Sequence, residues 1–386
     1  MSQLPEDWME VKLGEILNVQ TGKKNAQDSI DNGDYPFFTR SVDTQRIDTW
    51  SYDAESLFIA GEGNFAVKYY NGKFDLHQRT YMLTALKENA VDLKFLQNNI
   101  QPKVAKLVST SVGSTVQSLR KPIIESLKIP LPPLEEQKKI ADILSTVDKK
   151  IAFVEDNISQ TEELKKGLMQ KLLTQGIGHT EFKDSEVGRI PESWNLVQFD
   201  KVCDIRDGTH DSPKYIEEGI PFITSKHLTD NGIDFTETNY ITKEDHIEFS
   251  KRSKVDNGDI LFGMIGTIGK PTIVDTDFEF SIKNVALLKL SNNEFLSNIY
   301  ILNLLKSSII NKQFLKFSNG GVQSFIALGI IRKLKIPVPP LEEQKQIAEI
   351  LSTVDQKLEV LKEKKDFFKE LKKGLMQKLL TGVMRV

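Results

Sequence analysis

The sequence predicts an α+β protein in which two mixed α/β globular segments are separated by two long helices. The helices are expected to pair as an antiparallel coiled coil, with a pseudo-two-fold internal repeat. The first observation behind this prediction is that residues 127–174 return almost unchanged near the C-terminus, at one constant offset. The second is a heptad spacing of apolar residues in both copies. The third is a looser similarity between the segments that precede the copies. A duplication of this size determines the predicted architecture.

Each copy of the repeat predicts one long helix. Pro133 and Pro340 stand at the first turn, where a helix tolerates proline, and Gly176 and Gly382 follow the last apolar residues, where glycine commonly ends a helix. A helix of some 40 residues is roughly 60 Å long. Acidic residues in the first turn favour the helix dipole, although contacts with a partner protein explain them equally well: Glu135, Glu136, Glu342 and Glu343.

Apolar residues recur every three and four positions along both helices, which is the spacing of a coiled-coil seam. Lys165 and Lys372 interrupt the two seams at matching places, where we expect weaker or wetter pairing. The alternative is two unrelated amphipathic helices, each packed on its own domain. The predicted seam residues are Ile140, Leu144, Val147, Ile151, Val154, Ile158, Leu168, Leu172, Ile347, Leu351, Val354, Leu358, Leu361, Phe368, Leu375 and Leu379.

Chain order predicts the direction of pairing. The first helix leads from one globular segment into the other, and the second helix leads away from the second segment, so the compact solution is antiparallel. The expected divisions are a first globular segment, a first helix with its linker, a second globular segment and a second helix, at residues 1–126, 127–178, 179–333 and 334–386.

The globular segments resemble each other at a few anchors. Leu4–Trp8 matches Ile190–Trp194, Gly22 matches Gly208, and a Val-Gln-Ser sequence precedes an apolar residue in both. We expect Gln117 and Gln323, in that shared sequence, to be scaffold groups. Short apolar runs among Asn-Gly and Asp-Gly turn signals predict a small, strongly bent sheet in each segment. Helical patterns follow at residues 92–108 and 294–316, and a polar, glycine-bearing linker is expected at 176–185.

The composition narrows the class of protein. A 386-residue chain with 39% hydrophobic and 27% charged residues has an ordinary globular composition. Its single cysteine, Cys203, excludes an internal disulfide and a cysteine-rich zinc site, and suits the cytoplasm. No apolar run is long enough to cross a membrane. The net charge of −3 does not favour a protein that holds DNA alone through phosphates, so basic residues on one face or partner subunits would be needed.

No catalytic constellation is recognisable. The phosphate-loop candidate at 263–271 has Met264 in place of its first glycine and Pro271 in place of the magnesium-binding hydroxyl. Gly61–Ala66 only weakly resembles a dinucleotide loop. The five histidines show neither metal-ligand spacing nor a pairing with Cys203, so no metal site is expected. We therefore expect a non-catalytic protein without a cofactor of its own.

Two motifs resemble a known family. The pattern Ile-Pro-X-Pro-Pro-Leu-Glu-Glu-Gln-Lys, at 129–138 and 336–345, heads both helices and is similar to the specificity subunit of type I restriction-modification systems. The junction at 178–185, leading to Ile190–Trp194, resembles that family's central linker. Asp207–Pro213 resembles a segment common in its target recognition domains. The resemblance covers the whole chain.

The resemblance implies that each globular segment is a target recognition domain that reads half of a split, asymmetric site on double-stranded DNA, with the helices fixing the gap. It also implies two modification (methyltransferase) subunits that carry S-adenosylmethionine and methylate adenine. Restriction subunits, where present, would bring ATP- and Mg-dependent translocation and cleavage.

Side chains suited to DNA contacts are present in both segments, although ordinary solvent exposure explains each of them as well. Arginine and lysine favour guanine edges and phosphates. The candidates are Lys23, Lys24, Arg40, Lys68 and Arg79 in the first segment, and Arg206, Thr209, His210, Lys214, Lys226 and Lys270 in the second.

Two other functions compete with DNA specificity. One is a coiled-coil adaptor that joins two protein-binding domains. The other is a methyltransferase with a fused recognition domain. Such an enzyme has Asn or Asp before its Pro-Pro pair, whereas this chain has Leu131 before Pro132-Pro133, which argues against it.

Overall fold

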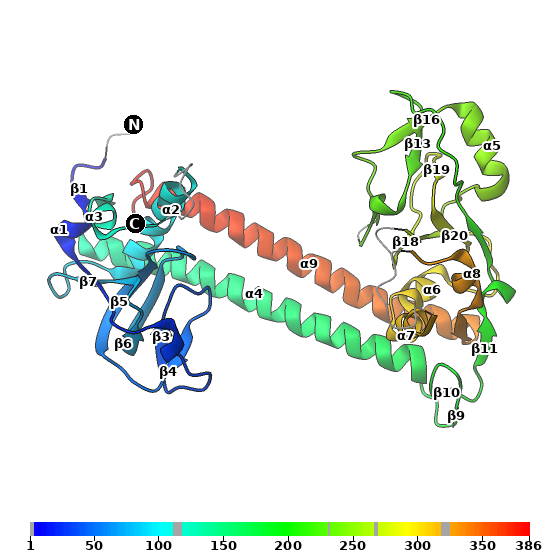
Figure 1. Cartoon of the computed structure of the whole chain (residues 1–386), viewed down its shortest axis with the longest axis horizontal. Helices are drawn as coiled ribbons and strands as arrows, with labels where there is room; N and C mark the ends of the chain where they lie inside the picture. Colours follow the sequence, from blue (N-terminus) through cyan, green and yellow to red (C-terminus); the bar gives the residue numbers. More distant parts are fainter. Residues whose placement is uncertain (1–3, 111–117, 231, 266–268, 318–324) are drawn as a thin grey trace. The chain divides into compact units, whose positions relative to one another are not determined.

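The computed structural model describes residues 4–110, 118–230, 232–265, 269–317 and 325–386. The chain forms two compact units (Figure 1). Unit 1 comprises Met1–Asp156 with Glu363–Val386, and unit 2 comprises Asn157–Lys362. Each unit contains one globular portion and part of both long helices.

The two predicted long helices are confirmed. Helix α4 spans Leu134–Gln175 and α9 spans Leu341–Leu379. α4 begins directly after Pro133, and Gly176 beyond its end has a φ of 63°. Gly382, which follows α9, has a φ of 76°. Positive φ is a conformation that glycine adopts without steric cost, so both helices end as the sequence predicts.

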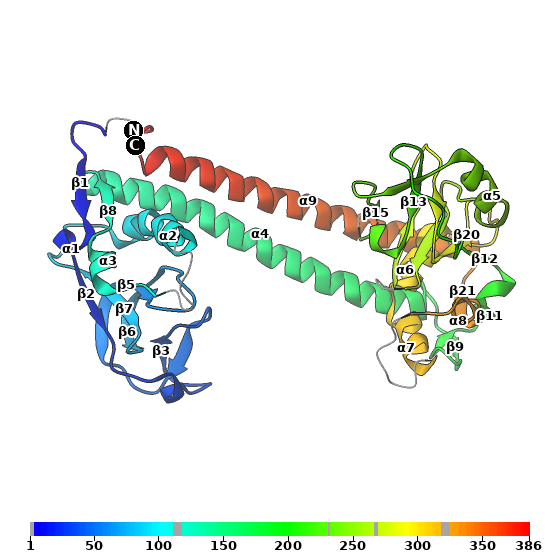
Figure 2. The same ribbon diagram turned by 45° about the horizontal axis from the view of Figure 1, so that its top comes forward.

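The helices pair antiparallel in unit 1, where they lie side by side in both ribbon views (Figures 1 and 2). Lys372 Nζ lies 2.7 Å from Asp148 Oδ1, and Lys369 Nζ lies 3.5 Å from Glu155 Oε1. The contacts run in opposite directions along the two helices, because the higher-numbered residue of α4 meets the lower-numbered residue of α9.

Unit 2 contains ion pairs at the equivalent positions of the opposite helices; the second pair keeps its lysine on α9 in both units. Lys165 Nζ lies 2.5 Å from Asp355 Oδ1, and Lys362 Nζ lies 4.0 Å from Glu162 Oε1. Both lysines that interrupt the apolar seams thus have acidic partners on the opposite helix. All the seam residues predicted from the sequence are buried or half-buried.

Unit 1 is built on a curled sheet with strand order β2-β7-β5-β6-β3-β4. The rings of Phe38 and Phe58 stack with centroids 3.8 Å apart, and Phe74 packs edge-on against Phe58 at 4.8 Å. With Leu76 and Met82 these rings form a small buried cluster among β3, β5, β6 and β7. The strands are β1 (Met9–Lys12), β2 (Leu17–Thr21), β3 (Tyr35–Phe38), β4 (Gln45–Ile47), β5 (Tyr52–Ala60), β6 (Lys68–Leu76), β7 (Thr80–Ala85) and β8 (Lys128–Leu131).

Unit 2 divides its strands among smaller sheets, chiefly β12-β20-β17-β18 and β16-β13-β19. The predicted strands at 260–262 and 285–288 are present as β17 and β20. The linker predicted at 176–185 contains β9, which pairs with β10. The strands are β9 (Phe182–Lys183), β10 (Ile190–Pro191), β11 (Asn195–Gln198), β12 (Asp204–Asp207), β13 (Ile220–Ile223), β14 (Leu228–Thr229), β15 (Gly232–Ile233), β16 (Asn239–Ile241), β17 (Ile260–Gly263), β18 (Gly269–Ile273), β19 (Ser281–Ile282), β20 (Val285–Lys289) and β21 (Lys335–Val338).

The helical pattern at 92–108 corresponds to α2, whereas the pattern at 294–316 forms two helices rather than one. Ser307 separates them, because its backbone N–H and its hydroxyl both donate to the Leu304 carbonyl, at 3.0 and 2.6 Å, and end the first helix. The shorter helices are α1 (Leu13–Ile16), α2 (Leu93–Thr110) and α3 (Lys121–Glu125) in unit 1, and α5 (Lys243–Ser253), α6 (Asn298–Leu305), α7 (Ser308–Phe317) and α8 (Leu328–Lys333) in unit 2.

A hydrogen-bonded joint fixes the globular portion of unit 1 to the start of α4. Trp8 Nε1 donates to Glu136 Oε2 at 3.1 Å, and Arg385 Nε donates to Glu136 Oε1 at 2.6 Å. Beside them, Gln137 Oε1 accepts from Asp92 N at 2.9 Å, directly before α2. The acidic side chain in this joint is nearly buried, so it serves the fold rather than an outside partner.

The start of α9 repeats this joint in unit 2. Trp194 Nε1 donates to Glu343 Oε2 at 2.9 Å, and His179 Nε2 lies 2.8 Å from Glu343 Oε1. Gln344 Oε1 accepts from Ser297 N at 2.9 Å, directly before α6. In each unit, the same Leu-Glu-Glu-Gln motif therefore fixes the globular portion to the start of a long helix.

Candidate nucleic-acid interface

Four of the five candidate residues in unit 1 lie at the ends of neighbouring strands. Lys24 follows β2, Arg40 follows β3, Lys68 begins β6, and Arg79 lies between β6 and β7. Residue Lys24 pairs with His77 as an isolated parallel bridge, which brings the loop after β2 against the end of β6. The fifth candidate, Lys23, is exposed beside Lys24.

Glu62 joins the two arginines of this group. Arg79 Nη1 donates to Glu62 Oε1 at 2.6 Å, and Arg40 Nη1 donates to the same oxygen. Hydrogen bonds from Arg79 and then from Arg40 hold the pKa of the Glu62 carboxyl below its ordinary value. The carboxylate is therefore ionised at neutral pH and carries the one negative charge between two positive ones.

Neighbouring polar groups hold the backbone on either side of the arginine pair. His77 is almost fully buried, and its Nδ1 accepts from the backbone N–H of Arg79 at 3.0 Å. Burial lowers the pKa of His77, and the charges of Arg40 and Arg79 lower it further, so the ring is neutral at pH 7. Lys68 Nζ donates to the Ser41 carbonyl at 3.0 Å, next to Arg40.

The candidates of unit 2 gather less tightly. His210 lies between Asn284 Oδ1, which is 2.7 Å from its Nδ1, and Asp207 Oδ2, which is 3.0 Å from its Nε2. Arg252 of α5 forms an ion pair with the other oxygen of Asp207. Thr209 Oγ1 accepts from Asp211 N at 3.0 Å. Thr209 and His210 thus lie on an ordered loop after β12.

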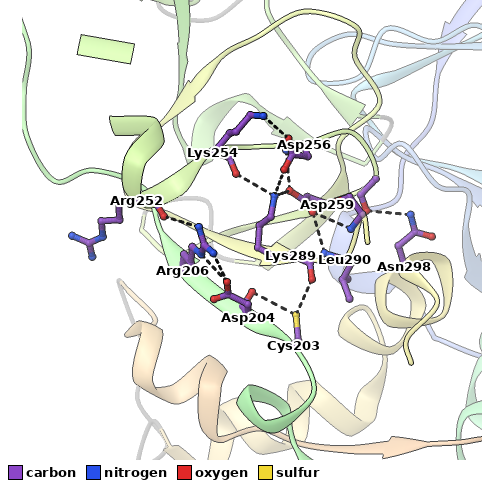
Figure 3. A network of polar contacts seen from close by, with 12 residues as sticks. Cys203, Asp204, Arg206, Arg252, Lys254, Asp256, Asp259, Lys289, Leu290 and Asn298 are labelled. Atoms are coloured by element: carbon purple, nitrogen blue, oxygen red, sulfur yellow. Dashed lines mark hydrogen bonds and ion pairs between the residues drawn. The ribbon is translucent and has the colours of Figure 1, made fainter. Parts of the chain in front are cut away.

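Arg206 belongs to a network at the side of β12 (Figure 3). Its Nε donates to Asp204 Oδ2 at 2.8 Å, and its Nη1 donates to the Arg252 carbonyl at 3.2 Å. Deeper in the network, the fully buried Asp259 accepts from Lys289 and, at 3.0 Å, from Leu290 N. These contacts fix the framework of unit 2 and leave Arg206 partly exposed at its margin.

The other three candidates of unit 2 lie on separate elements. Lys214 is in the segment between β12 and β13, Lys226 is in a one-turn 3₁₀ helix after β13 (Ser225–His227), and Lys270 is in β18. All three side chains are exposed. They do not form one cluster with His210 in the contacts that the structure describes.

One structurally equivalent position, just beyond a central strand, is charged in unit 1 and apolar in unit 2. After β5, Glu62 pairs with Ser118, and Leu119 N donates to the Gly61 carbonyl at 2.7 Å. After β17, Ile265 pairs with Phe325 in the same pattern, with Ile326 N donating to the Met264 carbonyl at 2.7 Å. Ile265 and Phe325 are 47% and 57% exposed, an unusual position for two large apolar side chains.

Sequence reasoning missed Glu62, Ile265 and Phe325. Glu62 lies within the segment compared with a dinucleotide loop, and its acidic charge does not suggest a DNA contact. The shared Val-Gln-Ser anchor aligns Phe325 with Leu119, one residue beyond Ser118, so it marks this neighbourhood but not the paired positions. Gln117 and Gln323, expected to be scaffold groups, lie outside the described residues.

The long helices expose a second kind of surface. Phe153 and Leu371 of unit 1 and Val360 and Leu164 of unit 2 are large apolar residues that remain exposed. Val360 lies one repeat after Phe153, and Leu371 lies one repeat after Leu164. The duplication has therefore kept exposed apolar side chains at equivalent positions on both helices.

The cysteine and the candidate metal ligands can be assessed over the described residues. Burial raises the pKa of the Cys203 thiol to about 12, so it is protonated at neutral pH. Within the described ranges there is no group of three or more His, Cys, Asp or Glu side chains that could hold a metal ion. Among the same residues, no helix has the length and apolar character needed to span a membrane.

Comparison with known proteins identifies the family. The family model described as "Type I restriction modification DNA specificity domain" matches residues 5–163 and again 191–367. The MjaVIII specificity subunit of a type I restriction enzyme from Methanocaldococcus jannaschii is 30% identical over all of this chain and 94% of its own length. The EcoDI specificity subunit from Escherichia coli is 25% identical, over 89% of this chain and 80% of its own.

A solved structure shares the fold. The crystal structure of a type I restriction-modification system S subunit from M. genitalium superposes with a TM-score of 0.65, at 18% identity, over 98% of this chain and 97% of that one. The fold, the two family-model matches and the full-length relatives agree. The chain belongs to the family of type I restriction-modification specificity subunits.

Proposed function

We propose that each globular portion of this chain reads one half of a bipartite, asymmetric DNA site, and that α4 and α9 set the number of base pairs between the halves. One observation carries this proposal: the joints and helix contacts are duplicated, while the side chains at the strand ends are not. A duplicated framework with unlike loops suits two readers of unlike sequences. A homodimer would instead read a palindrome.

The DNA contacts in this proposal come from the candidate residues. Lys24, Arg40, Lys68 and Arg79, with Lys23 beside them, contact one half-site. The loop that carries Thr209 and His210, with Arg206, contacts the other half. Lys214, Lys226 and Lys270 supply outlying phosphate contacts. The net charge of −3 predicts weak binding by the chain alone, so partner subunits contribute further phosphate contacts.

Two modification subunits are the proposed partners of the helices. The exposed apolar residues Phe153 and Leu371 in unit 1 correspond to Val360 and Leu164 in unit 2. Two equivalent surfaces suit two copies of one partner. Restriction subunits join the assembly in systems that cleave DNA. We place the complex in the cytoplasm.

The chemistry of the complex belongs to the partners in this proposal. The modification subunits carry S-adenosylmethionine and methylate adenine, and the restriction subunits use ATP and Mg. In this proposal the chain determines which DNA sequence the complex binds and is not itself a catalyst. Burial raises the pKa of the Cys203 thiol, which disfavours the thiolate that a nucleophilic cysteine needs.

The test is binding by the complex of this chain with the modification subunits of its own system. Mapping methylated adenines across the genome of cells that contain the complex defines the candidate site. We expect the complex to retain a duplex carrying that site in preference to a scrambled duplex, with retention that falls steeply as salt rises. Equal retention of both duplexes would favour a protein-binding adaptor. Methyl transfer by this chain alone would favour a fused methyltransferase.

A further inference from the structure

We propose that Glu62 is a positioning residue that holds Arg40 and Arg79 together as a reader of guanine in the half-site contacted by unit 1. This inference rests on the proposed function and adds to it the base that one domain recognises and the residue that sets up its recognition.

Glu62 holds one Nη1 group of each arginine. Both Nη1 groups donate to one oxygen, Glu62 Oε1, so the two side chains converge on a single point. Glu62 is the least exposed of the three side chains, at 19%, whereas Arg40 and Arg79 are 43% and 59% exposed. The carboxylate therefore lies at the base of the cluster, and the arginines extend from it toward solvent.

The backbone beneath the cluster is held as firmly as the side chains. Gly61 N donates to the Arg79 carbonyl at 2.8 Å, and Asn64 N donates to the Arg40 carbonyl at 3.3 Å. Both arginines are thus fixed to the segment that carries Glu62. An arginine held in this way loses less rotamer entropy when it binds, which favours recognition with defined geometry.

The remaining donors match a guanine edge. Each guanidinium has five N–H donors in a planar fork, and Glu62 engages one Nη1 on each. In the contacts that the structure describes, the Nε and Nη2 groups of Arg40 and Arg79 form no ion pair. Two parallel N–H groups of arginine match O6 and N7 of guanine, which is the commonest specific contact in the major groove.

The charges around the pair favour a base over a phosphate as its target. Glu62 offsets one of the two arginine charges, which weakens attraction to a phosphate but leaves directional donors in place. Lys24, whose Nζ lies 3.8 Å from Asp75 Oδ2, and Lys68, whose Nζ donates to the Ser41 carbonyl, are single ammonium charges without a planar fork, which suit phosphates better than a base edge. We therefore assign base reading to the arginine pair and phosphate contacts to the lysines.

The experiment compares base preference in the complex with modification subunits. The bipartite site is first defined from the methylation map of the wild-type complex. Binding is then measured by competition against duplexes in which each base pair of both half-sites is replaced in turn. The variants are Arg40→Ala, Arg79→Ala and Glu62→Gln, which keeps the size of the side chain but removes its charge.

The matched control is Glu10→Gln. Glu10 of β1 forms an exposed ion pair with Lys128 of β8, at 2.7 Å, on two antiparallel strands of the same unit that the proposed function does not use. We expect this variant to bind every duplex as the wild type does. The second half-site is the internal control for folding, because its base preferences must be retained by every variant that has folded.

The expected result is specific to position. Both arginine variants should lower the preference for G·C at the same half-site by about fivefold to a hundredfold, and Glu62→Gln should lower it at the same position by less. A half-site without guanine would overturn the proposal, as would unchanged preferences. A uniform loss of affinity with a shallower salt dependence would also overturn it and assign the arginines to phosphates. A wild-type complex that prefers no bipartite site would instead refute the proposed function, before any variant is made.

Discussion

The joints of units 1 and 2 are alike, whereas their strand-end clusters differ. In both joints a buried tryptophan donates to the second glutamate of the Leu-Glu-Glu-Gln motif, at 3.1 Å from Trp8 and 2.9 Å from Trp194. At the strand ends, the position that carries the Glu62–arginine cluster in unit 1 carries the exposed pair Ile265 and Phe325 in unit 2. The duplication keeps the framework and allows the strand-end side chains to diverge, which are the ones we propose to contact DNA.

The helix contacts support the same distinction. The two ion pairs of unit 1, Lys372–Asp148 and Lys369–Glu155, have counterparts in unit 2 that use the equivalent positions of the opposite helix. Such exchange is what a pseudo-two-fold repeat requires, because each position of one helix must serve in both settings. A framework constrained in this way can accept new loops without changing its joints.

The largest expected effect comes from breaking a joint. Trp194→Ala removes a fully buried ring and leaves Glu343 without its indole donor, so we expect unit 2 to lose about 3–5 kcal/mol of stability. Trp8→Ala should destabilise unit 1 to a similar extent. Urea unfolding gives the magnitude, and hydrogen exchange shows which unit has been weakened.

The control for both variants is Trp50→Ala. Trp50 is 44% exposed and lies beneath Lys73, with Nζ 4.3 Å from the ring centroid, so its loss should cost less than about 1 kcal/mol. If one joint variant behaved like Trp50→Ala while the other was severely weakened, the two joints would not be equivalent.

A smaller effect is expected at the apolar pair of unit 2. Ile265→Ala and Phe325→Ala remove exposed side chains that suit contact with the methyl group of thymine, so discrimination at one A·T position should fall by about tenfold. The half-site read by unit 1 should be unaffected. The same panel of substituted duplexes measures both. A change confined to the first half-site would reverse our assignment of this pair.

The smallest effect is expected in the helix seam. A double-mutant cycle on Lys165 and Asp355 should give a coupling energy of about 0.2–1 kcal/mol, because the pair is partly exposed. The equivalent cycle on Lys372 and Asp148 should give the same value within error. Urea unfolding of the single and double variants supplies both energies. Clearly unequal coupling energies would show that the two ion pairs differ in strength although they occupy equivalent positions of the repeat.

Much of the fold could be predicted because it depends on local, repeated signals. The proline before α4 and the glycine after it determine where that helix begins and ends, and the heptad spacing predicts its buried face. The break between α6 and α7 could not be predicted from periodicity. It depends on Ser307 donating two hydrogen bonds to one carbonyl, which does not alter the apolar pattern.

The candidate interface was predictable only as a list of suitable side chains. Sequence reasoning proposed Arg40 and Arg79 separately, and it could not place them on a shared oxygen of Glu62, because the three residues follow different strands. The role of Glu136 was left open between helix dipole and partner contact. The structure gives it Trp8 and Arg385, which are remote in sequence.

The central claim is that the two globular portions read DNA independently on one shared framework. The most direct measurement is the methylation map of a complex in which residues 1–126 are replaced by the corresponding segment of a homologous chain. We predict that one half of the methylated site changes while the other half and the gap between them stay the same. A change in both halves, or a change in the gap, would contradict the account.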